Sequence, residues 1–207
     1  AWKTWTGPFY ADLPRVDVRQ LGQYVALDQR IREGNGALRL WGDLRRGEVT
    51  GGTADVMLHA VDVTLADELQ PLVLRGVAGR LESHWGDDGF ALSTPRLQFE
   101  THDGLEWPGG NVAVGRPAAT PGNSEHGRFL ADRLDLAMIT QIADRLPLAP
   151  TVRQQLLSRA PRGLVERIDV AWQGDFETPE RYQAKGRVTD LALASIPGEP
   201  EAAATPE

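Results

Sequence analysis

The stretch from Gly89 to Asn111, GFALSTPRLQFETHDGLEWPGGN, constrains the fold of this chain more than any other. Apolar and polar residues alternate through it, but the apolar parity changes partway. Phe90 and Leu92 lie at even positions, Leu97 and Phe99 lie at odd positions, and a proline stands between the two sets. A strand that swaps its apolar side needs one extra residue, a β-bulge, where proline is tolerated because it cannot donate to the ladder. Two glycine-containing turn sequences follow, so the stretch predicts an antiparallel meander with one apolar and one polar face.

Six further segments alternate in the same way, within residues 37–45, 48–65, 72–85, 112–114, 164–172 and 182–193. The second and third also change parity, near His59-Ala60 and at Gly76. Strict alternation with one polar side is typical of a half-solvated antiparallel sheet, and bulges and glycines are the devices that bend sheets. Residues 127–136 also read as a strand, with either Phe129 and Ala131 or Leu130 and Leu134 on its apolar side. The chain is therefore predicted to be mainly β, with one long, curved antiparallel meander sheet.

Three short helices are predicted to cover parts of this sheet, at about residues 17–33, 136–146 and 150–159. Their apolar residues recur at helical spacing, and Asp17 and Asp135 are suitable N-caps. Pro150 suits a first helical position. Residues 2–10 are aromatic, and Gly7-Pro8 is predicted to interrupt them. Residues 1–194 are expected to form one segment of a larger protein, and residues 195–207 a disordered tail.

Composition excludes several classes of function. The formal net charge is −7, which disfavours nucleic acid and a polybasic grip on anionic head groups. The chain has no cysteine, so disulfides, zinc thiolate sites and thiol nucleophiles are excluded. The longest apolar runs are four residues, whereas a membrane-spanning helix needs about 20.

No arrangement of residues predicts catalysis, a metal site or a cofactor. The four histidines are scattered along the chain, and the Ser124–His126 pair lacks the pattern of a nucleophile elbow. Glu100, Asp103 and Glu106 lie close in sequence but carry no specificity without geometry, so they are assigned no role. We expect a protein that is not an enzyme and that binds no cofactor.

Three tryptophans allow more than one interpretation. If Trp41, Trp107 and Trp172 are exposed, they could be platforms on which sugar rings stack. They could equally be packing residues, or aromatic residues at the boundary between the polar and apolar faces.

The apolar side of the sheet is the main functional candidate. A sheet that curls without closing would leave an open groove lined by apolar residues, which suits acyl chains better than a defined small molecule. The alternative is a closed sandwich or barrel, whose apolar side packs on itself. The residues whose parity places them on the candidate groove face are Leu38, Leu40, Leu44, Val56, Leu58, Val61, Val63, Leu81, Phe90, Leu92, Leu97, Phe99, Val112, Val114, Ile168, Val170 and Val188.

Four segments between Pro8 and Leu193 resemble a known family. They are GALRLWGDLRRGEVTGGTADVMLHAVDV, GFALSTPRLQFETHDGLEWPGGN, FLADRLDLAMITQIADRLPL and APRGLVERIDVAWQGDFETPERYQAKGRVTDLAL. In sequence and order they resemble the mid-region of the large AsmA-like proteins of the YhdP type from Gram-negative bacteria. The resemblance implies a section of a long periplasmic β-groove, held at the inner membrane by a helix outside this chain.

The same resemblance implies non-catalytic transfer of phospholipid between the inner and outer membranes. Its partners would be phospholipid acyl chains, the rest of the same polypeptide on both sides, and envelope proteins. Two alternatives are kept open: a closed β-sandwich that serves as a periplasmic interaction or scaffold module, and a carbohydrate-binding or glycosidase-like β domain.

Overall fold

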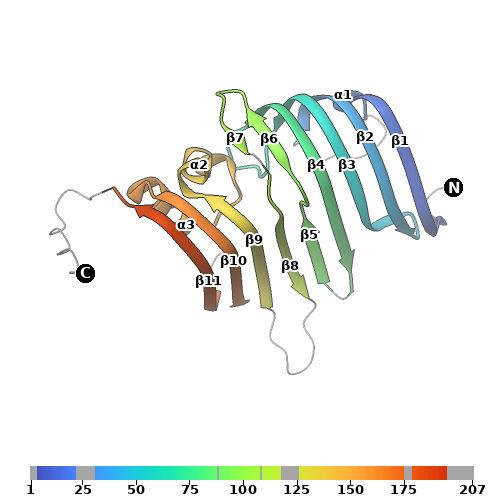
Figure 1. The fold of residues 1–207 in the computed structure, drawn as a ribbon. Coiled ribbons are helices and arrows are strands. Elements are labelled where there is room, and N and C mark those ends of the chain that lie inside the picture. The colour runs from blue at the N-terminus through green and yellow to red at the C-terminus, as the bar shows by residue number, and fades with distance from the viewer. Residues whose placement is uncertain are drawn as a thin grey trace, which may run out of the picture.

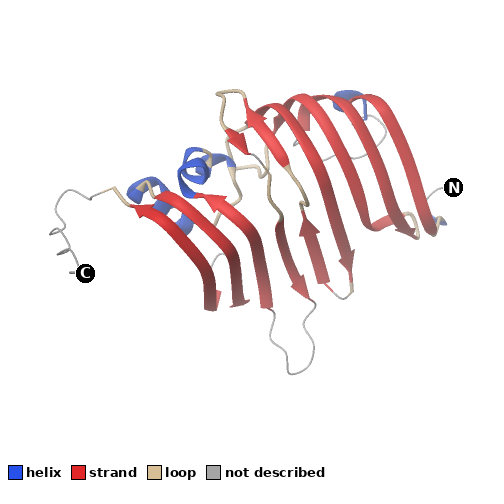
Figure 2. Ribbon diagram, in the orientation of Figure 1, coloured by secondary structure: helices blue, strands red, loops and turns tan. Residues whose placement is uncertain are grey.

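A computed structural model describes residues 4–21, 31–87, 89–107, 109–117, 126–174 and 179–194. Its strands form one antiparallel sheet that bends along its length (Figures 1 and 2). The strands are β1 (Gly7–Asp17), β2 (Ile31–Arg45), β3 (Glu48–Val63), β4 (Leu72–Gly86), β5 (Gly89–Ser93), β6 (Gln98–Thr101), β7 (Glu106–Trp107), β8 (Val112–Pro117), β9 (His126–Asp135), β10 (Arg162–Gly174) and β11 (Pro179–Ala192).

The sheet is open. Its strands lie in the order β1-β2-β3-β4-β5-β8-β9-β10-β11, so that β1 and β11 are its edges, and the β6–β7 hairpin branches off β4. Strand β4 pairs with β5 along one half and with β6 along the other. The prediction of a mainly β, open antiparallel meander is confirmed, and the alternative of a closed sandwich is wrong.

The predicted parity changes are confirmed as local breaks in the ladders. In β3 the break is at Ala60, whose φ is 51°, and in β4 it lies between Leu74 and Gly76. The stretch between β5 and β6 includes Arg96, whose φ is 56°. A bulge bends its strand and increases the local twist. These positions therefore explain why the strands curve in Figure 1.

The helices are α1 (Val18–Leu21), α2 (Leu136–Gln141), a 3₁₀ turn (Ala143–Arg145) and α3 (Pro150–Arg159), and α2 is shorter than predicted. The prediction of a helix over 17–33 is wrong for residues 31–33, which begin β2 and pair with the end of β3, so that pairing overrides the helical spacing. Residues 22–30 lie outside the described part. Helix α3 matches its prediction, and α2 begins as predicted, because the Asp135 carboxylate accepts a hydrogen bond of 3.1 Å from the N–H of Met138.

The predicted interruption at Gly7-Pro8 coincides with the start of β1, since residues 5 and 6 lie in no strand, but β1 then runs on to Asp17 through Pro8 and Pro14. Proline lacks an N–H but is tolerated in an edge strand. The register of β1 against β2 shifts between Leu13 and Val16, next to Pro14. The predicted disordered tail, 195–207, lies outside the described residues.

The main hydrophobic core covers only one end of the sheet. Val18 of α1 packs with Leu58 and Val61 of β3 and with Leu72 and Leu74 of β4. No helix in the described ranges is both long and apolar enough to cross a membrane.

Candidate functional site

One face of the sheet is apolar across almost its whole width. Residues that pair directly across an antiparallel ladder point to the same side. The pairs on this side, which we call the apolar face, are Leu13–Leu38, Leu38–Val56, Leu58–Val77, Leu92–Val114, Val114–Phe129, Phe129–Val170 and Val170–Ala184. This pairing resolves the parity of β9: Phe129 and Ala131 lie on the apolar face, and Leu130 lies on the opposite face.

The residues predicted to line a groove differ in burial. Leu58, Val61 and Ile168 are buried. A second group is half-buried: Leu38, Leu40, Leu44, Val56, Val63, Leu97, Phe99, Val112, Val114 and Val170. The third group is exposed: Leu81, Phe90, Leu92 and Val188. The first group packs within the protein, and the other two leave apolar surface that the described residues do not cover.

Around β1 to β3 the apolar face is the less exposed of the two faces. Leu40 and Val56 on this face are half-buried. Tyr10 and Met57, at neighbouring positions on the opposite face, are 57% and 59% exposed.

Aromatic rings fill the apolar face at places where the sequence has glycine. A Cβ at Gly127 would lie 2.0 Å from the ring of Trp172, and a Cβ at Gly42 would lie 2.4 Å from the ring of Phe9. Each glycine is therefore covered by an aromatic side chain from the neighbouring strand. Neither pair is predictable from the sequence, because the signal, a glycine opposite an aromatic residue, appears only once the strand register is known.

The interpretation of Trp107 and Trp172 as exposed platforms is wrong, because both are 7% exposed. Trp107 stacks on Phe99 with ring centroids 6.1 Å apart and planes 5° apart. Trp41 lies on the opposite face, beside Tyr10. The three tryptophans therefore do not form the row that a sugar-binding surface would need.

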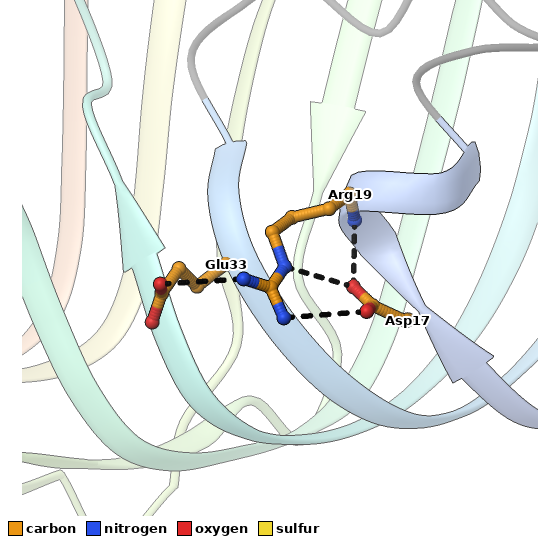
Figure 3. Close-up of polar contacts among 3 residues, drawn as sticks. All are labelled: Asp17, Arg19 and Glu33. Carbon is orange, nitrogen blue, oxygen red and sulfur yellow. Dashed lines mark hydrogen bonds and ion pairs between the residues drawn. The ribbon is translucent and has the colours of Figure 1, made fainter.

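Helix α1 covers one end of the apolar face. Val18 is buried there, and its Cγ2 lies 3.2 Å from where a Cβ at Gly34 would be, so glycine allows the close approach. Arg19 of the same helix is placed between two carboxylates (Figure 3). It lies 3.3 Å from Asp17 and 3.8 Å from Glu33, and the hydrogen bond from Arg19 lowers the pKa of Asp17. These contacts tie α1 to the adjoining ends of β1 and β2.

The opposite face carries ion pairs that link neighbouring strands. Arg80 donates to Asp55 at 2.6 and 2.9 Å and lies 5.8 Å from the centre of the Trp41 ring. Arg128 donates to Asp169 at 2.9 and 2.8 Å. In both pairs the hydrogen bond from arginine lowers the pKa of the aspartate. The sheet is thus apolar on one face and carries these ion pairs on the other.

The acidic residues near the β6–β7 turn do not form a catalytic pair. Glu100 accepts a hydrogen bond of 2.6 Å from Arg75, and Asp103 lies 3.7 Å from Arg145. The described residues include no group of three or more His, Cys, Asp or Glu side chains that could hold a metal ion. The feature that remains is the apolar face.

Comparison with known proteins agrees with the resemblance seen in the sequence. A search of curated proteins and a search of solved structures returned no match. A family model described as YhdP protein matches residues 1–203, and the chain therefore belongs to the YhdP family.

Proposed function

We propose that this chain is a section of a hydrophobic groove that conducts phospholipid, without catalysis, between the inner and outer membranes of a Gram-negative envelope. The acyl chains lie on the apolar face. The section is periplasmic and is tethered to the inner membrane through a helix outside this chain, with further parts of the same polypeptide on both sides. Membership of the YhdP family supports a role related to lipid transport and is in keeping with a protein that is not an enzyme.

The observation that carries the proposal is an apolar face that continues from strand to strand across an open sheet. Each buried methylene of an acyl chain contributes about 0.8 kcal/mol. Each residue of the row that runs from Leu92 through Val114 and Phe129 to Val170 is apolar, so a tail that crosses these strands would gain similar energy at successive positions. Such a surface holds a tail and lets it slide.

A photocrosslinking amino acid tests where the lipid lies. Leu92 and Leu130 are a matched pair, because both are leucines in central strands and are 39% and 38% exposed. Leu92 lies on the apolar face and Leu130 on the opposite face. In the complete protein in its own membranes, we expect phospholipid to crosslink at position 92 and not at position 130. Equal crosslinking at both positions would contradict the proposal.

A charge on the apolar face tests transport itself. We expect Leu92→Asp to block lipid passage in the complete protein, because a carboxylate in the path of an acyl chain must be desolvated. Leu130→Asp should leave passage unchanged. Circular dichroism of both variants separates a blocked path from lost folding, and equal transport by the two would contradict the idea. Phe99→Asp is a harsher version, because it also removes the stack on Trp107.

A further inference from the structure

The two ends of the strands differ on the apolar face. Helices α1 and α2 and the β6–β7 hairpin lie at one end, where β3 finishes and β4 begins (Figures 1 and 2). Val18, Leu58 and Leu72 are buried there. At the other end, which we call the hairpin end, β4 turns into β5. Trp85 and Phe90 of that hairpin are 49% and 39% exposed. An acyl chain on the apolar face therefore meets the protein's own core at one end and aromatic side chains at the other.

A row of aromatic residues crosses the hairpin end. Trp85 pairs with Phe90, which lies two residues before Leu92 and so shares the apolar face. Trp172 pairs with Tyr182 and lies two residues beyond Val170, on the same face. Tyr182 is 76% exposed, whereas Trp172 is buried over Gly127. Tryptophan and tyrosine combine an apolar ring with a polar tip and are enriched where hydrocarbon meets lipid headgroups.

Arg116 stands in this row. Strand β8 places Val112 and Val114 on the apolar face, and Arg116 follows at the next position of the same parity, paired with Phe90. Arg116 is half-buried, and its Nη2 donates to the carbonyl oxygen of Gly174 at 3.3 Å. Because β9 lies between β8 and β10, the guanidinium extends across β9 to the end of β10. A cation is thus placed at the hairpin end of the apolar face.

We propose that Arg116 binds the phosphodiester of a phospholipid whose acyl chains lie on the apolar face, an inference that rests on the proposed function. A guanidinium fork matches phosphate oxygens, and the apolar stem of arginine can lie along an apolar surface while the charged head stays at the water boundary. The headgroup lies at the hairpin end, because the core occupies the other end.

One acidic side chain lies near the same carbonyl. The Cγ of Glu180 is 3.2 Å from where a Cβ at Gly174 would be. A carboxylate beside Arg116 opposes the binding of a phosphate, so removal of its charge should strengthen that binding.

The complete protein with a photocrosslinking amino acid at position 92 tests this inference. It is exposed to vesicles with equal amounts of phosphatidylethanolamine and of diacylglycerol with identical acyl chains, and mass spectrometry identifies the attached lipids. We expect phosphatidylethanolamine in excess, because diacylglycerol has no phosphate. Arg116→Gln should lower the ratio of phosphatidylethanolamine to diacylglycerol by about threefold, the scale of one ion pair near the surface. Arg116→Lys should keep part of the ratio, because the charge remains while the fork is lost. Glu180→Gln should raise the ratio.

Arg181→Gln is the matched control. Arg181 is an exposed cation at the same end of the sheet, but it pairs with Gln173 and so lies on the opposite face. If Arg116→Gln gives the same ratio as Arg181→Gln, the phosphate site is refuted while the groove stands. Equal loss of both lipids in Arg116→Gln would also refute the site, because it would show only a structural role for the bond to Gly174.

Two further outcomes separate the remaining cases. Excess inorganic phosphate at constant ionic strength should leave the ratio unchanged. If inorganic phosphate lowers the ratio to that of Arg116→Gln, the site binds the free anion and the headgroup inference is wrong. If position 92 of the otherwise unchanged protein captures neither lipid, the proposed function fails and this inference fails with it.

Discussion

Replacing Gly127 with alanine should destabilise the protein, because the new methyl group would enter the space of the Trp172 ring. The Cβ would lie 2.0 Å from two ring atoms, far inside van der Waals contact. Two responses are available to the protein. Either Trp172 leaves the apolar face, or the ring stays and the neighbouring strands shift.

The magnitudes favour the second response. A buried aromatic side chain removes about 150–250 Å² from water. At about 25 cal/mol per Å², expelling Trp172 would cost about 4–6 kcal/mol. Overpacking with retained side chains typically costs about 1–3 kcal/mol. We therefore expect Gly127→Ala to lower the free energy of unfolding by about 1–3 kcal/mol.

Urea unfolding followed by tryptophan fluorescence measures this loss. Gly76→Ala is the control, because a Cβ there would meet its nearest atoms at ordinary distances of 3.5 and 3.7 Å. That substitution should be neutral, or stabilise by up to about 1 kcal/mol, because alanine loses less backbone entropy than glycine. In a Trp172→Leu background, Gly127→Ala should cost clearly less. If Gly127→Ala is as mild as Gly76→Ala, the ring does not occupy the position described here.

Three further outcomes follow from the structure. Ala60→Gly should stabilise by about 0.5–1 kcal/mol in urea unfolding, because a left-handed alanine costs roughly 1–2 kcal/mol and glycine entropy roughly 0.5–1 kcal/mol; a loss would argue against the bulge in β3. Met138→Ala should lower the thermal midpoint, with a cost of about 2–5 kcal/mol for a buried side chain, and an unchanged midpoint would contradict its burial. The folded-state pKa values of Asp55 and Asp169 are depressed below 3.8, so their stabilising contribution is present above that pH and is lost as the pH falls through the folded values. Thermal unfolding between pH 6 and pH 2 should therefore show less acid sensitivity in Arg80→Met than in wild type.

The sheet was predictable from sequence because its strands are consecutive and its alternation is regular. The breaks near Ala60, at Gly76 and near Pro95 were readable because a bulge changes the parity of every residue after it. The prediction of a helix over 17–33 is wrong from residue 31 onward. These residues pair with β3, and that pairing depends on a bulge in β3 rather than on local spacing. Strand β1 was missed because its prolines are acceptable only at an edge, and edges are a property of the assembled sheet.

The candidate site was predictable in outline only. Parity indicated which residues share a face, but not that Leu58 and Ile168 are buried while Leu92 is exposed. Burial depends on where α1 and the other helices pack on the sheet, and the sequence of a short helix does not indicate its position. A lipid-lining role for the predicted residues stays a prediction.

The serial pairing of the strands also determines how such a protein could change in size. A barrel has a fixed number of strands, since closure sets its circumference, whereas here most strands pair only with their neighbours along the chain. Adding or deleting a hairpin in the middle would lengthen or shorten the sheet without requiring the distant strands to rearrange, much as repeat proteins grow by whole units. The length of the apolar face therefore depends on the number of hairpins that the gene encodes. Natural selection could adjust that number to the distance that must be bridged.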